Sequence, residues 1–156
     1  MNAGNKIRHL LKTREFINVA TCDSNGNPNV APKFILKSEE QYVYLVDYVL
    51  GRTWQNLKEN PRVSLSFMDL DSLTGYQFNG RVEIIDRGKE YDVLLEEITA
   101  REISLSAKRI LEGLDSGEKH SSFEVAFSEH IAVFRVRIED YAEITPFGKV
   151  KREKVE

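Results

Sequence analysis

The chain has 156 residues, of which 41% are hydrophobic and 30% are charged, and its formal net charge at pH 7 is −3. These totals predict one ordinary globular domain, and the small acidic excess argues against a general nucleic-acid binder. The single cysteine rules out an internal disulfide. No apolar run reaches the roughly 20 residues of a membrane span and no apolar signal segment follows the N-terminus, so we expect a cytoplasmic protein with no membrane partner.

A helix and three short strands are predicted in the first third of the chain. Helical spacing of apolar residues favours a helix over 5–13, and apolar or β-branched residues favour strands over 16–21, 29–36 and 41–47. The Asn25-Gly26 pair between the first two strands is a strong hairpin signal. The three strands are therefore expected to form an antiparallel meander.

A short helix with a basic start is predicted after the third strand. Gly51-Arg52-Thr53 opens this helix, and Asn60-Pro61 ends it. The first N–H groups of a helix lack partners within the helix and carry a partial positive charge. Arg52 and Thr53 add a guanidinium and a hydroxyl at that end, which favours a site for a phosphate-bearing cofactor. The simpler alternative is that both residues only cap the helix in solvent.

Strands resume after this helix, over 63–68 and 75–85. Apolar and polar residues alternate along the second of them, as in a half-buried strand. Gly80 lies inside it and predicts a bulge or a close approach of another backbone. A last alternating strand is predicted over 131–144, and the charged tail over 149–156 is expected to fray.

The segment between the last two strands is predicted to be helical. Its apolar spacing over about 86–115 is that of one or two amphipathic helices. A solvated face with i,i+4 pairs is expected for its charged residues Glu96, Glu97, Arg101 and Glu102. Six antiparallel strands with helices at the periphery predict a mainly β (α+β) domain over 1–156, most simply a small β-barrel.

Four segments in the first 85 residues carry a resemblance to a known family. They read ATCDSNGNP at 20–28, PKFILK at 32–37, GRT at 51–53 with NLKENPRV at 56–63, and GYQFNG at 75–80. Their order and spacing resemble the pyridoxamine 5'-phosphate oxidase-like family. The resemblance implies a six-stranded antiparallel split β-barrel that binds FMN at the interface of a homodimer. It also implies an oxidoreductase that takes electrons from a small-molecule or protein donor.

The resemblance further implies which residues contact the cofactor. The second strand would lie along the flavin, the end of the third strand would add contacts, and the helix start would hold the phosphate. Residues 75–77 would approach the flavin from the neighbouring subunit. The cofactor-binding residues expected on these grounds are Pro32, Lys33, Phe34, Lys37, Val46, Asp47, Arg52, Thr53, Asn56 and Gln77. No catalytic residue is assigned, and the three histidines lack metal-ligand spacing, so no metal site is predicted.

Two lysines on the second strand have a second interpretation. Lys33 and Lys37 are polar residues on an otherwise apolar strand, and their stems can simply cover apolar surface while the ammonium groups reach water. In the functional interpretation, one of these cations lies near the pyrimidine edge or the phosphate of the flavin. A positive charge there stabilises the anionic reduced flavin. Lys37 is at the position where the family's oxidase directs a lysine to its substrate.

The sequence departs from the oxidase in three places. Pro32 stands where the oxidase has an arginine, and the phosphate signature at Gly51-Arg52-Thr53 follows an extra residue within 48–50. The oxidase's C-terminal motif of arginine, proline and tryptophan is absent from 144–149. Oxidation of pyridoxamine phosphate is therefore not expected.

Three alternatives to an FMN oxidoreductase follow from the same sequence. The first alternative is a non-catalytic flavin carrier, the second is a split barrel that binds F420 or haem, and the third is an interaction domain without a cofactor. F420 has a long acidic tail and favours a site with several cations, whereas Arg52 is the one clear anchor and favours FMN. The long helical segment favours the interaction domain, since it offers a docking face.

Overall fold

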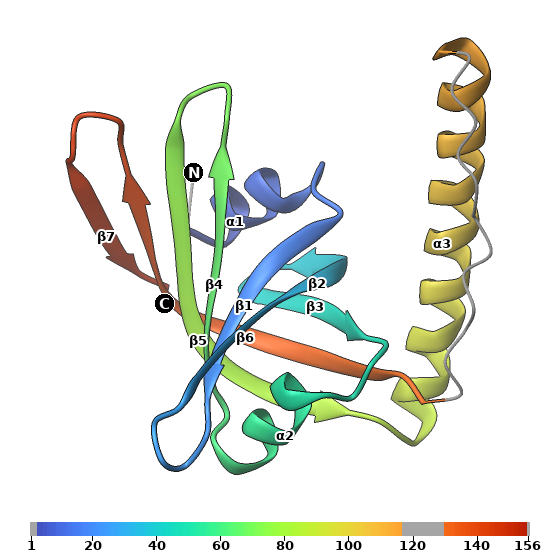
Figure 1. Cartoon of the computed structure of the whole chain (residues 1–156), viewed down its shortest axis with the longest axis horizontal. Helices are drawn as coiled ribbons and strands as arrows, with labels where there is room; N and C mark the ends of the chain where they lie inside the picture. Colours follow the sequence, from blue (N-terminus) through green and yellow to red (C-terminus); the bar gives the residue numbers. More distant parts are fainter. Residues whose placement is uncertain (1–2, 117–129, 156) are drawn as a thin grey trace.

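A computed structural model describes residues 3–116 and 130–155, which form a β-barrel flanked by three helices (Figure 1). The elements follow one another as α1 (Ala3–Leu11), β1 (Phe16–Cys22), β2 (Pro28–Glu39), β3 (Tyr42–Asp47), α2 (Arg52–Glu59), β4 (Arg62–Asp69), β5 (Thr74–Ile85), α3 (Lys89–Ser116), β6 (Ala132–Ile144) and β7 (Val150–Lys154).

The barrel closes because β6 pairs with strands at both ends of the sheet. The strand order is β3-β2-β1-β4-β5-β6-β7, and an additional β3–β6 pairing joins the two edges. All pairings are antiparallel, and β3 meets β6 from Tyr42 opposite Arg137 to Asp47 opposite Ala132. The predicted six-stranded antiparallel barrel with peripheral helices is confirmed.

Gly80 marks the predicted irregularity in β5. The register between β5 and β6 shifts between Asn79 and Gly80, which is a β-bulge. A Cβ atom at Gly80 would lie 2.0 Å from the backbone oxygen of Arg137, closer than any side chain tolerates. Glycine is therefore required at this position because the backbone of β6 occupies the space of a side chain.

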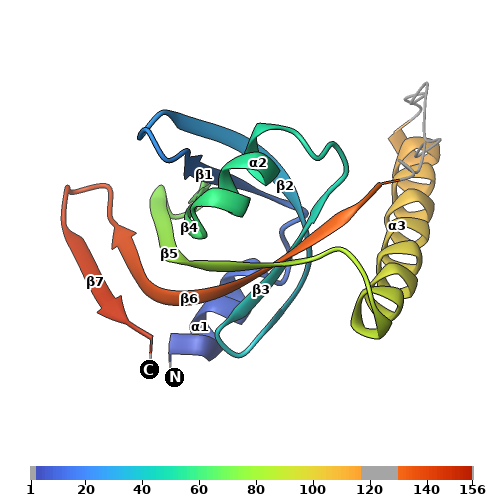
Figure 2. The same cartoon turned by 90° about the horizontal axis from the view of Figure 1, so that it is seen from below.

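Alternation along the strands separates two hydrophobic cores. Inward-facing residues such as Val19, Leu45 and Phe134 fill the barrel, together with residues of α1 and Leu57 of α2. Figure 2 shows α2 lying across one end of the barrel. Outward-facing residues of β2, β3 and β6 pack instead against Leu94, Ile98 and Leu105 of α3. Successive residues along β2 and β3 therefore face the barrel interior and α3 in alternation.

Two expectations from the sequence are corrected by the fold. The charged tail does not fray over its whole length, because Val150–Lys154 pairs with β6 as β7. The charged face of the helical segment is not wholly solvated, because Glu102 is 7% exposed and lies against the barrel side of α3. No helix in the described ranges has the length and apolar character needed to cross a membrane.

Candidate cofactor site

The start of α2 presents unpaired backbone donors beside a guanidinium. Gly51 precedes the helix, no side chain caps it, and its first turn holds no acidic residue. Arg52 is exposed at this end, whereas Thr53 is only 2% exposed. Helix N–H groups without a capping partner attract anions, and a nearby arginine adds charge-assisted hydrogen bonds.

Two hydrogen bonds, one buried and one partly buried, hold α2 against the β1–β2 hairpin. The amide of Asn29 on β2 donates to Oγ1 of Thr53 at 3.1 Å. The amide of Asn56, itself 4% exposed, donates to Oγ1 of Thr21 on β1 at 3.1 Å. Both contacts hold the helix start in one orientation, so Thr53 and Asn56 have structural partners in addition to any cofactor.

A depression of about 560 Å³ lies between α2 and the β1–β2 turn, and Arg52 and Asn56 line it. Asp23 also lines it. Hydrogen bonds from the side chain and backbone of Asn27, and the positive charge of Arg52, lower the pKa of Asp23. The carboxylate partly balances the guanidinium, which remains at the rim of the depression.

Lys33 and Asp47 form an ion pair inside the barrel. Nζ of Lys33 donates to Oδ1 of Asp47 at 2.7 Å, and the two side chains are 9% and 0% exposed. Oδ1 also accepts the backbone N–H of Val49 at 3.2 Å, while Oδ2 is buried with no partner among the described residues. Neither interpretation of Lys33 from the sequence includes this contact, because its partner is 14 residues away on β3.

The outward face of the same strands lies under α3. Phe34 and Val46 are 6% and 1% exposed and belong to the core that Leu94, Ile98 and Leu105 complete. Pro32 is exposed. The strand expected along the flavin thus directs Lys33 into the barrel and Phe34 toward α3.

Lys37 is tied to α3 by its charge. Its Nζ lies 2.9 Å from Glu97 of α3 and 3.1 Å from Glu39, and 4.9 Å from the centre of the Tyr44 ring. Burial alone lowers the pKa of Lys37, but the hydrogen bonds to the two carboxylates outweigh it and raise the pKa above its ordinary value. The ammonium therefore stays charged at every physiological pH.

Tyr48 and Glu102 form a polar contact that sequence reasoning missed. The Tyr48 hydroxyl donates to Oε1 of Glu102, and Oε2 is buried without a partner in the described structure. Burial and this contact raise the pKa of Tyr48. The signal was present in the helical spacing, since Glu102 follows Ile98 by four residues and precedes Leu105 by three, on the buried stripe of α3.

Gln77 lies apart from the other candidates. It is on β5, where its amide donates to Oγ of Ser64 at 3.1 Å, and its Oε1 accepts from Arg152 of β7 at 3.5 Å. The structure therefore brings Arg52, Thr53 and Asn56 together on α2 and pairs Lys33 with Asp47. It places Phe34, Val46 and Lys37 beneath α3 and Gln77 on the β4–β5 face.

Solved structures with the same fold carry several cofactor names. A Clostridium acetobutylicum protein related to general stress protein 26 matches with a TM-score of 0.64 and 18% identity over 97% of this chain and 93% of that one. An FMN-binding protein of Nostoc punctiforme matches at 0.61 and 12%, over 97% and 95%. The haem storage protein HutZ of Vibrio cholerae matches at 0.59 and 17%, over 89% and 92%. An F420 reductase matches at 0.56 and 18%, over 86% and 94%.

Sequence comparison adds a relative and a family. An uncharacterised protein of Methanocaldococcus jannaschii, MJ0282, is 32% identical over 87 residues, which are 54% of this chain and 57% of that protein. The chain thus spans little more than half the length of this relative. The sequence profile described as pyridoxamine 5'-phosphate oxidase matches residues 3–139, from α1 into β6. The chain therefore belongs to the pyridoxamine 5'-phosphate oxidase family.

Proposed function

We propose that this protein binds FMN, with the phosphate at the start of α2, and acts as an oxidoreductase. The observation that carries the proposal is the uncapped helix start with an exposed Arg52, in a helix that one buried and one partly buried hydrogen bond hold to the barrel. The phosphate of FMN is close to a dianion, and a hydrogen bond to a charged group contributes about 1.5–3 kcal/mol. The bound flavin supplies the redox chemistry, and the protein supplies binding and orientation.

The arrangement of the other candidates supports a site completed by a second copy of the chain. Gln77 is on β5 and does not line the depression at Arg52, and we propose that it contacts the flavin of the neighbouring subunit. We therefore propose a homodimer with the flavin at its interface and a small-molecule or protein electron donor. Membership of the family supports this proposal.

F420 and haem remain the competing cofactors, because split barrels named for both have TM-scores close to that of the FMN-binding one. A non-catalytic flavin carrier differs from the oxidoreductase only in lacking turnover. The test is therefore a comparison of cofactors on one protein preparation, followed by an assay for turnover.

The experiment is reconstitution with FMN, F420 or haem, gel filtration, and the visible spectrum of the protein peak. We expect FMN to co-elute with a species of about twice 17.9 kDa. Arg52→Gln should weaken FMN binding at least tenfold, which corresponds to about 1.4 kcal/mol. Lys58→Gln, which removes the same charge from the last turn of α2, should not change it.

Two results would contradict the proposal. Equal FMN affinity in Arg52→Gln and the wild type would remove the phosphate site from α2. Retention of F420 or haem in place of FMN would change the cofactor. Oxidation of NADH or NADPH by the FMN-loaded protein, with an added acceptor, then separates an oxidoreductase from a carrier.

A further inference from the structure

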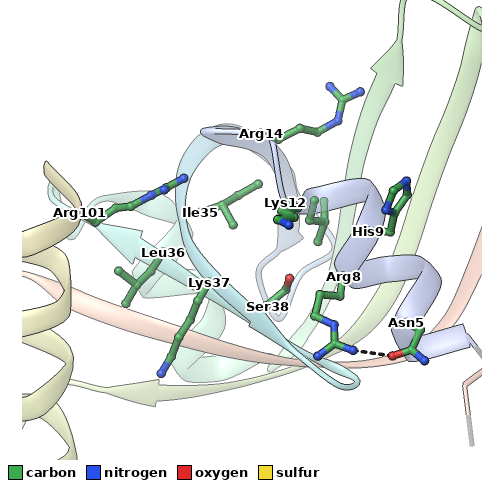
Figure 3. Close-up of a pocket in the computed structure, with 11 residues that line it drawn as sticks. Asn5, Arg8, His9, Lys12, Arg14, Ile35, Leu36, Lys37, Ser38 and Arg101 are labelled. Carbon is green, nitrogen blue, oxygen red and sulfur yellow. Dashed lines mark hydrogen bonds between the residues drawn. The ribbon is translucent and has the colours of Figure 1, made fainter. Parts of the chain in front are cut away.

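A cleft of about 660 Å³ opens between α1, β2 and α3, and basic side chains dominate its lining (Figure 3). The cleft lies away from the start of α2 and shares no lining residue with the depression at Arg52. Its basic residues come from α1 and the turn after it, from β2 and from α3: Arg8, His9, Lys12, Arg14, Lys37 and Arg101. No aspartate or glutamate is among the described residues that line it.

The positive charge of the cleft is mostly uncompensated. Lys37 is paired with two carboxylates, but Lys12, Arg14 and Arg101 form no ion pair within the described ranges. The Arg14 guanidinium lies over the Phe67 ring, 3.8 Å from its centre. The Nε atoms of Arg14 and Arg101 are buried without a hydrogen-bond acceptor in the described structure. Both Nε donors are therefore desolvated without compensation, which leaves the outer nitrogens of each guanidinium as the groups that a ligand could contact.

Six of the 25 lysine, arginine and histidine residues of the chain line this one cleft, although the net charge is −3. Three elements distant in the sequence converge to build it, and like charges gathered in one concave site repel one another. Figure 3 shows Arg101 reaching from α3 toward β2 while Arg8 and Lys12 stand on the α1 side. A bound anion with several negative charges would reduce the repulsion between these cations.

We propose that this cleft binds a small anion with at least two phosphate groups, such as the diphosphate of a nucleotide. Guanidinium groups bind carboxylate and phosphate oxygens in a bidentate fork, and the number of cations in the cleft favours a ligand with several negative charges, as a diphosphate has. Leu11, Ile35 and Leu36 line the same cleft but are only 2%, 3% and 7% exposed, so we expect mainly polar contacts to the ligand. The volume is within the range of small-molecule sites. The inference goes beyond the FMN proposal and does not depend on it.

The test is calorimetric titration of the full chain with inorganic pyrophosphate and with ADP. We expect saturable binding of one ligand per chain, weakening as salt is added. Lys12→Gln with Arg101→Gln should raise the dissociation constant for both ligands at least tenfold. Arg87→Gln with Lys89→Gln removes two exposed charges at the start of α3, outside the cleft, and should change it less than twofold.

Free nucleotides and nicotinamide dinucleotides share the diphosphate group, so NADH and NADPH are titrated beside ADP to identify the source. If the Arg101 variant does not fold, Arg8→Gln with Lys12→Gln replaces it, since both residues are exposed. The titrations use protein free of FMN, because Lys37 is both an expected flavin contact and a lining residue of the cleft. A failure of FMN binding at Arg52 therefore leaves this result unchanged.

Three outcomes would overturn the inference. The first is the absence of saturable binding by pyrophosphate and ADP. The second is an equal loss in the cleft variant and the control variant, which would mean a response to overall charge. The third is displacement of ADP by a single-stranded RNA oligonucleotide that binds more tightly, which would make the cleft part of a nucleic-acid surface.

Discussion

Removing one partner of the Lys33–Asp47 pair should destabilise the barrel far more than removing both. The two atoms are 2.7 Å apart, and the side chains are 9% and 0% exposed, so neither charge has water as an alternative partner. Asp47→Ala leaves the Lys33 ammonium buried without a carboxylate. Lys33→Met leaves the Asp47 carboxylate with only the Val49 N–H.

The expected magnitude follows from the burial. Breaking a buried pair from one side costs about 3–5 kcal/mol, whereas replacing both members by apolar residues is often neutral or stabilising by about 1–4 kcal/mol. Oδ2 of Asp47 already lacks a partner among the described residues, which adds an unsatisfied group that the double variant removes. The free energy of unfolding of the double variant Lys33→Met with Asp47→Leu should therefore be no more than about 1 kcal/mol below that of the wild type, or above it.

The assay is urea unfolding of the wild type, both single variants and the double variant at pH 7. The coupling between the two positions is the difference between the double variant and the sum of the single ones. A loss below about 1 kcal/mol in Asp47→Ala would mean that the pair is solvated. A double variant less stable than either single variant would mean that the interior does not accept apolar side chains there, and would refute the reasoning.

Three further predictions concern the bulge, the hairpin turn and α3. Gly80→Ala should cost about 3 kcal/mol in urea unfolding, since its Cβ would overlap a backbone oxygen of β6; wild-type stability would exclude the bulge. Hydrogen bonds from Asn27 lower the pKa of Asp23, so Asp23 contributes stability above its ordinary pKa of 3.8 and loses it as the pH falls through the folded value. The difference in free energy of unfolding between the wild type and Asp23→Ala should therefore be largest at pH 7 and become smaller below pH 3.8. A difference that does not change with pH would contradict this role of Asp23. Ile98→Ala should cost about 2–5 kcal/mol because Ile98 is fully buried, while Ile110→Ala at a half-exposed position of α3 should stay within about 0.5 kcal/mol. Equal thermal shifts in the two variants would mean that α3 does not pack on the sheet as described.

The strands along the chain and the first hairpins were predictable because they depend on local patterns, whereas the β1–β4 and β3–β6 pairings join distant segments and were not. Alternation of apolar residues located β5 and β6, the turn at Asn25-Gly26 fixed the first hairpin, and Gly80 signalled the bulge without any knowledge of β6. The position of β7 was not predictable from composition, because its five residues are charged apart from Val150. Backbone pairing with β6 holds it, and backbone pairing leaves little trace in side chains.

The candidate site was predictable only where its residues are neighbours in the chain. Arg52, Thr53 and Asn56 fall on one short helix, so their grouping followed from sequence spacing. The direction of Lys33 into the barrel and the burial of Glu102 depend on strand register and on where α3 docks. Helical spacing places Glu102 on the apolar stripe of α3, but the partners of Lys33 and Glu102 do not follow from the sequence, since both lie elsewhere in the chain.

The closing role of β6 has a consequence for the growing polypeptide. Before β6 is made, the other five strands can pair only as an open sheet in the order β3-β2-β1-β4-β5, with β3 and β5 at its edges. β6 covers both edges, and it follows β5 only after the whole of α3. Open edges invite pairing with other chains. Any folding intermediate in which β6 has not yet paired therefore exposes two unpaired strand edges, at β3 and β5, and is open to pairing with other chains.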